Sequence, residues 1–187
     1  MRPALVLGLA VLLFPCPGTA QTFEITDQVS DATGMRRVAS ADLRPLSDRS
    51  YTGTHAAFQA VYEESPNGGA AWMLTIFGYA SDTTAMGRAS TAQVRADGSP
   101  VPPRRVTSKL RRLDASLLEI KQIVLTESGF SRLARADQVV VSIGPARFTL
   151  DRVRRTDLRL IQERLSASPP SRTSSQGTAV DTSGAEG

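Results

Sequence analysis

Residues Thr54–Ser81, THAAFQAVYEESPNGGAAWMLTIFGYAS, carry the strongest strand pattern in the chain. Apolar and polar residues alternate in the first half, with the period of two that a strand shows. Ala70–Ala80 is then apolar at most positions. Between the two runs, SPNGG offers an Asn-Gly pair, which tolerates the positive φ angles of tight hairpin turns. The segment predicts a β-hairpin whose second strand lies at the centre of a sheet, covered on both faces because both are apolar.

Further strand patterns lie on both sides of this hairpin. We expect strands at 22–26, 89–97, 104–114 and 116–125, and a second hairpin within 137–150. Segment 116–125 also fits a helix, but its isoleucines and valine favour a strand. Residues 27–50 contain few large apolar side chains and predict a long loop or an irregular edge. The prolines at 100, 102 and 103 cannot donate to a β-ladder and predict a rigid turn or an edge.

Two helices are predicted near the C-terminal end of the domain. Thr126 or Ser128 can cap a short helix near 128–136. Leu158, Ile161 and Leu165 share one helical stripe, which predicts an amphipathic helix near 152–165 that packs on the sheet. Together these patterns predict an α+β fold, mainly an antiparallel sheet or sandwich of about seven or eight strands.

The N-terminus has the composition of an export signal. Arg2 precedes an uncharged apolar run of 11 residues, 4–14, which is shorter than the ~20 residues of a membrane-spanning helix. Small residues follow, ending at Ala20. We therefore expect residues 1–20 to be a signal peptide and the protein to be exported, to the periplasm or outside the cell. A lipid anchor on Cys16 is the less favoured alternative, because Phe14 and Pro15 fit a lipidation site poorly.

Cleavage after residue 20 leaves one predicted domain and a tail. Residues 21–166 are expected to form a single β-rich globular domain. Residues 167–187 are rich in Ser, Thr, Gly and Pro and predict a disordered tail. The only cysteine lies in the predicted signal peptide, so the mature chain would have neither disulfides nor thiol chemistry. We also expect no transmembrane segment in the mature chain.

Positive charge is concentrated in the second half of the domain. Residues 21–100 hold 6 basic and 9 acidic side chains, and residues 101–166 hold 14 basic and 7 acidic ones. A solvated basic face is the simplest interpretation, and a patch that attracts anionic polymers or lipid head groups is the alternative. The candidate contact residues are Arg104, Arg105, Lys109, Arg111, Arg112, Arg154 and Arg155. Export and the absence of interleaved aromatic residues argue against nucleic acid as the partner.

Signals for catalysis are weak. A single histidine, His55, and a cysteine-free mature chain argue against a zinc or copper site. No Gly-x-Ser-x-Gly motif is present. The acidic pair Glu63–Glu64 gives the weak case for a hydrolase that uses carboxylates alone. Trp72 and Tyr79 could line a sugar or peptide cleft, although core positions are more typical of such a strand. We expect no enzyme, no metal and no cofactor.

The function that these observations favour is contact-based. We expect a non-catalytic binding or structural domain of the bacterial cell envelope that contacts a protein or an envelope polymer. Another copy of the same chain is an alternative partner. The first alternative is a carrier of a small apolar or lipidic ligand, with one face of Ala70–Ala80 lining a cavity. An acid-only hydrolase is the less favoured third hypothesis.

Overall fold

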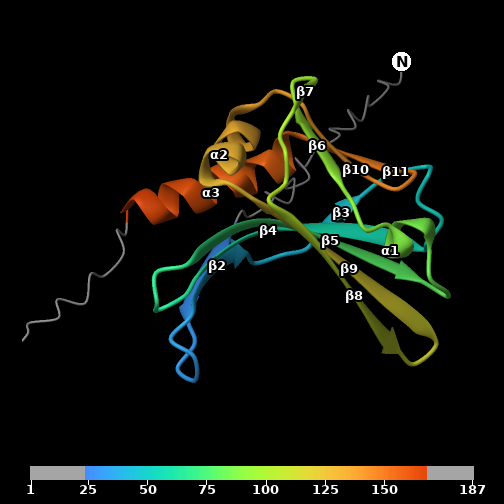
Figure 1. The fold of residues 1–187 in the computed structure, drawn as a ribbon, viewed down its shortest axis with the longest axis horizontal. Helices are drawn as coiled ribbons and strands as arrows, with labels where there is room; N and C mark the ends of the chain where they lie inside the picture. The colour runs from blue at the N-terminus through green and yellow to red at the C-terminus, as the bar shows by residue number, and fades with distance from the viewer. Residues whose placement is uncertain (1–23, 168–187) are drawn as a thin grey trace, which may run out of the picture.

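The computed structural model describes residues 24–167 and shows two antiparallel sheets with helices (Figure 1). The strands are β1 (Ile25–Val29), β2 (Arg36–Ser40), β3 (Arg44–Leu46), β4 (His55–Glu64), β5 (Ala70–Ala80), β6 (Gln93–Ala96), β7 (Ser99–Pro100), β8 (Arg105–Leu113), β9 (Ser116–Leu125), β10 (Val139–Ile143) and β11 (Ala146–Leu150). The helices are α1 (Ala85–Arg88), α2 (Glu127–Arg135) and α3 (Arg152–Ala167). The α+β class is therefore confirmed. The predicted signal peptide and the tail from residue 168 lie outside the described residues and stay predictions.

The seven-stranded large sheet is built around the hairpin of β4 and β5. Its order is β1-β2-β4-β5-β9-β8, and β3 also pairs with β4. The hairpin runs in register from His55 opposite Tyr79 to Glu64 opposite Ala70. At the turn, Gly68 has φ of +87°, a conformation that glycine adopts without a Cβ clash. The predicted hairpin and the central position of β5 are both confirmed.

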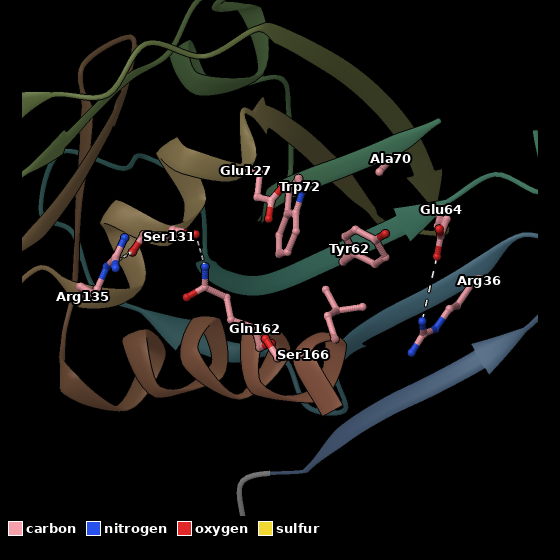
Figure 2. Close-up of a pocket in the computed structure, with 11 residues that line it drawn as sticks. Arg36, Tyr62, Glu64, Ala70, Trp72, Glu127, Ser131, Arg135, Gln162 and Ser166 are labelled. Carbon is pink, nitrogen blue, oxygen red and sulfur yellow. Dashed lines mark hydrogen bonds and ion pairs between the residues drawn. The ribbon is translucent and has the colours of Figure 1, made fainter. Parts of the chain in front are cut away.

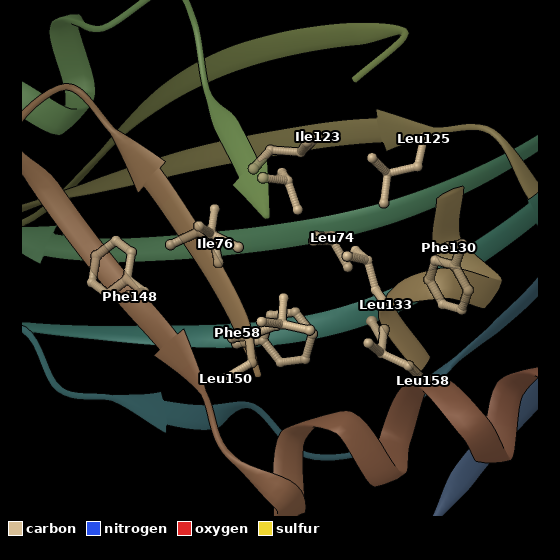
Figure 3. Close-up of a cluster of buried hydrophobic side chains, with 14 of the residues drawn as sticks. Phe58, Leu74, Ile76, Ile123, Leu125, Phe130, Leu133, Phe148, Leu150 and Leu158 are labelled. Atoms are coloured by element: carbon tan, nitrogen blue, oxygen red, sulfur yellow. The ribbon is translucent and has the colours of Figure 1, made fainter. Parts of the chain in front are cut away.

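The core lies between the large sheet and a second layer made of α2, α3 and the four-stranded sheet β11-β10-β6-β7 (Figure 1). Figure 3 shows large side chains from both layers meeting there. The labelled residues are Phe58, Leu74, Ile76, Ile123, Leu125, Phe130, Leu133, Phe148, Leu150 and Leu158, each no more than 1% exposed. The core-facing side of β5 is therefore packed against protein.

The sequence predicts that other elements cover both faces of β5, and this prediction is right for one face only. All described helices and the small sheet lie on one side of the large sheet (Figure 1). On the opposite side, here called the outer face, Met73 packs with Val61 and Ala39 of the neighbouring strands. Phe77 and Tyr79 remain partly exposed there. These outer-face residues are buried by one another across the strands and not by a further described layer.

The strand prediction was wrong mainly between residues 25 and 50. A long loop or an irregular edge was expected over 27–50. The loop alternative is wrong, because β2 and β3 form there, and β1 and β2 lie at one edge of the large sheet; β1 begins three residues later than expected. These strands are hard to recognise because they hold few large apolar residues. The buried positions of β2 beside Val38 are the small Ala39 and Ser40. Eleven strands result in the described part instead of seven or eight. The strand expected at 89–97 is also shorter: β6 covers only Gln93–Ala96, and α1 ends before it at Arg88.

Both longer helices begin at a capping residue, and the cap of α2 is Thr126, one of the two predicted candidates. Thr126 Oγ1 accepts a hydrogen bond from the Gly129 N–H at 3.0 Å, and Asp151 does the same for Arg154 at 3.1 Å. The apolar stripe of α3 faces the core, with Leu158 and Ile161 fully buried, so its predicted packing on the sheet is confirmed. No helix in the described part of the chain is long and apolar enough to cross a membrane.

A buried ion pair fastens α3 to the large sheet. Asp157 of α3 is fully buried, and Arg44 of β3 donates to its two carboxylate oxygens at 3.0 and 3.3 Å. Burial raises the pKa of Asp157, and the hydrogen bond from Arg44 opposes that shift. The pair joins residues that are 113 positions apart in the chain. It therefore fixes where α3 lies on the sheet.

Candidate functional site

An open cleft of about 550 Å³ lies between the turn end of the β4–β5 hairpin, α2 and α3 (Figure 2). Its lining combines aromatic, charged and neutral polar side chains. The lining residues are Arg36, Tyr62, Glu64, Ala70, Trp72, Glu127, Ser131, Arg135, Gln162, Leu165 and Ser166. Its volume is within the range of about 300–1,000 Å³ that ligand sites in proteins show.

Two aromatic rings form the strand wall of the cleft. Tyr62 and Trp72 are direct cross-strand partners in the hairpin, and such partners bring their side chains together on one face. Their ring centroids are 4.8 Å apart and the rings meet edge-on. Phe130 of α2 supports the indole from the core, at 5.0 Å. Trp72 is therefore held in place while part of it stays exposed to the cleft.

Polar side chains spaced four residues apart on α2 and α3 form the helical walls of the cleft. Glu127, Ser131 and Arg135 are four residues apart along α2, so they lie on one side of the helix. Gln162 and Ser166 have the same spacing on α3. The Gln162 amide donates to the Ser131 hydroxyl and so joins the two walls (Figure 2). The cleft therefore presents donors and acceptors from rigid elements.

A charge cluster borders the hairpin end of the cleft. Arg36 lies opposite Glu64 in the β2–β4 pair, with 4.0 Å between the charged atoms. Arg36 also donates to both carboxylate oxygens of Asp27, at 3.0 and 2.8 Å, and Arg164 of α3 donates to Asp27 at 3.2 Å. The hydrogen bond from Arg36, helped by that from Arg164, lowers the pKa of Asp27 despite partial burial. This cluster ties β1, β2 and α3 together.

Tyr62 is the polar aromatic group at the centre of the cleft. Burial raises its pKa, and the nearby Glu64 carboxylate raises it further. The phenol is therefore a neutral hydrogen-bonding group at physiological pH. Two arginines and two glutamates line the cleft, so its formal charge is balanced. This arrangement suits a ligand that is neutral overall and carries its own donors and acceptors.

The seven basic candidates separate into two groups. Arg105, Lys109, Arg111 and Arg112 lie on β8 and Arg104 directly precedes it. All five are exposed. Arg154 and Arg155 lie far off on α3 and are engaged within the fold. Arg154 contacts the Asp151 carboxylate and the Pro45 carbonyl, and Arg155 donates to the Ala136 carbonyl.

The residues that the sequence offered for catalysis or for a sugar or peptide cleft are also dispersed. Glu63 and Glu64 point to opposite faces of β4, where they meet Arg37 at 3.6 Å and Arg36 at 4.0 Å. They do not face one substrate together. His55 is exposed and stacks on Tyr79 at 4.4 Å on the outer face, so Tyr79 does not share a cleft with Trp72. Within residues 24–167, no three His, Cys, Asp or Glu side chains converge.

The sequence interpretation missed a pair of buried charges on β9. Glu119 and Lys121 are 0% and 1% exposed. Glu119 accepts two hydrogen bonds from Thr84, both at 2.6 Å. Lys121 donates to the Gly87 carbonyl at 2.9 Å, and burial lowers its pKa. Both residues flank Ile120 in the strand, so they share the opposite face, which is the core face. This alternation was the sequence signal that could have located them. They hold α1 against β9.

The fold and this cleft define a class: an α+β protein of two layered antiparallel sheets with an open amphipathic cleft at one end of its central hairpin. Comparisons with protein-family models, with curated proteins and with solved structures give no match. The residues of the cleft are therefore the guide to what this chain binds.

Proposed function

We propose that this chain is an exported, non-catalytic binding protein of the bacterial cell envelope, and that it holds a segment of its partner in the cleft between α2, α3 and the β4–β5 hairpin. The single observation behind this proposal is the composition of that cleft. A partly exposed Trp72 stands beside Tyr62 on rigid strands, with balanced charges around both. Aromatic anchors with a polar rim are typical of contact sites that bind part of another molecule.

The packing of the core supports binding in the cleft over the carrier hypothesis. The core-facing row of β5 contains Leu74 and Ile76, which are 0% exposed and surrounded by apolar side chains (Figure 3). A carried apolar ligand would need that space. The cleft instead opens to solvent and is lined by polar groups. It suits a segment of a larger partner better than an enclosed small molecule.

The arrangement of carboxylates supports a non-catalytic role. The one adjacent acidic pair, Glu63 and Glu64, is divided between two faces of the sheet. In the cleft, Glu64 is held near Arg36 and Tyr62, contacts that serve binding and positioning. We therefore assign the cleft to recognition.

Differential capture from an envelope extract tests this proposal. The double variant Glu127→Gln/Gln162→Ala removes one charge and one amide from the cleft walls. The matched control, Glu163→Gln/Gln138→Ala, makes the same chemical changes at exposed positions outside the cleft. We expect wild type and control to retain one common partner, protein or polymer, and the cleft variant to bind it about tenfold more weakly. Equal retention by the cleft variant would refute the cleft as the binding site.

A further inference from the structure

The long outer strand β8 forms a second feature, separate from the cleft. In the large sheet β8 pairs only with β9, and its other edge has no partner strand among residues 24–167. An outer strand leaves alternate backbone N–H and C=O groups unpaired along that edge. β8 is nine residues long. That length is enough to pair with an extended segment of similar length.

Cations are concentrated on this edge without acids to neutralise them. The five basic residues of 104–112 make no ion pair or side-chain hydrogen bond with any other described residue. β8 itself carries no acidic residue. A ligand that pairs with this edge would therefore gain charge complementarity from carboxylates.

The placement of the cations indicates the shape of that ligand. Arg105, Lys109 and Arg111 are opposite Val124, Ile120 and Leu118 of β9, which places them on the outer face. Arg112 lies on the other face, in the row of Ser108, whose hydroxyl contacts the core-facing Lys121. A flat anionic bilayer would contact one face of the sheet only. A strand added in the plane of the sheet lies beside both the outer-face row and Arg112.

We propose that β8 binds an extended acidic segment of a partner protein, which adds to the large sheet as an eighth strand. Successive residues on one face of a strand are about 7 Å apart. Carboxylates at alternate positions of the added strand would therefore include partners for Arg105, Lys109 and Arg111, with Thr107 between the first two cations. A second copy of β8 does not fit this edge, because the two rows of like charges would repel each other.

Two peptides of equal charge test strand addition. One alternates glutamate and valine over about ten residues, and the other alternates glutamate and proline, which cannot donate to a ladder. Fluorescence anisotropy with the full chain should show the valine peptide binding about tenfold or more tightly than the proline peptide. Amide hydrogen exchange should slow in β8 when the valine peptide is bound. Equal affinities, or no protection in β8, would overturn the proposal.

Matched charge variants separate the site from net charge. Arg105→Gln/Arg111→Gln removes two cations of β8. Arg49→Gln/Arg147→Gln removes two exposed arginines elsewhere. We expect the first variant to weaken the valine peptide about tenfold and the second to change its affinity less than about threefold. Equal weakening by both variants would show a non-specific charge effect and contradict strand addition at β8.

Discussion

Removing the Asp157 carboxylate should destabilise the fold strongly, because it leaves a buried cation without its main partner. In Asp157→Leu, the Arg44 guanidinium, on a side chain that is 8% exposed, would keep Asp42 at 3.7 Å as a neighbouring acid. Breaking a buried ion pair costs about 3–5 kcal/mol. Asp42 offsets part of that cost although its side chain is 68% exposed, so we expect about 3 kcal/mol. For a domain of this size, that corresponds to a fall in Tm of about 6–12 °C.

Thermal and urea unfolding followed by circular dichroism would measure this loss. The double variant Arg44→Met/Asp157→Leu replaces both charges by apolar groups and should regain most of the stability, to within about 1 kcal/mol of wild type. Asp42→Asn, the control at the exposed partner, should cost less than about 1 kcal/mol. A Tm for Asp157→Leu within about 2 °C of wild type would refute the reasoning. A double variant as unstable as Asp157→Leu would assign the loss to helix packing instead.

The remaining predictions concern a surface charge cluster and a close contact. Because the pKa of Asp27 lies below its ordinary value of 3.8, its stabilisation is complete above about pH 5 and is lost as the pH falls through the folded-state pKa. Urea titrations should therefore show the difference in unfolding free energy between wild type and Asp27→Asn shrinking as the pH falls below about 5. In Gly87→Ala, the new Cβ would lie 2.1 Å from the buried Glu119 Oε1, so we expect about 1–3 kcal/mol of destabilisation in urea unfolding. The control Gly69→Ala, with its nearest atom at 4.0 Å, should be close to neutral, and equal losses in both variants would contradict the assigned clash.

Local patterns predicted the parts of the fold that depend on local physics. The alternation in Thr54–Ser81 and its Asn-Gly turn predicted the central hairpin. Thr126, one of the two predicted capping residues, marks where α2 begins. β2 and β3 were missed, because they are short and contribute small or charged residues to the sheet. Their strand conformation comes from pairing with β4, which is a long-range effect.

The cleft could not be assembled from the sequence, because its walls come from four distant segments. Arg36, Trp72, Glu127 and Gln162 meet only after the sheet, α2 and α3 have packed. The interpretation of Trp72 as a core residue was half right, since Phe130 buries one side of the indole and the cleft exposes another. The basic group was easier to locate. Four of its members lie on β8 and Arg104 directly precedes that strand, so close spacing in the chain becomes close spacing in space.

Fluorescence of Trp72 is the most direct report on the cleft, because this residue is the only tryptophan in the chain. Titrating the full chain with the purified envelope partner should shift its emission in a saturable way as the indole leaves water. In Glu127→Gln/Gln162→Ala, the same shift should need about tenfold more partner. If the partner binds with unchanged affinity in this variant, or binds without altering the Trp72 emission, recognition takes place elsewhere on the molecule and the proposed function of the cleft is wrong.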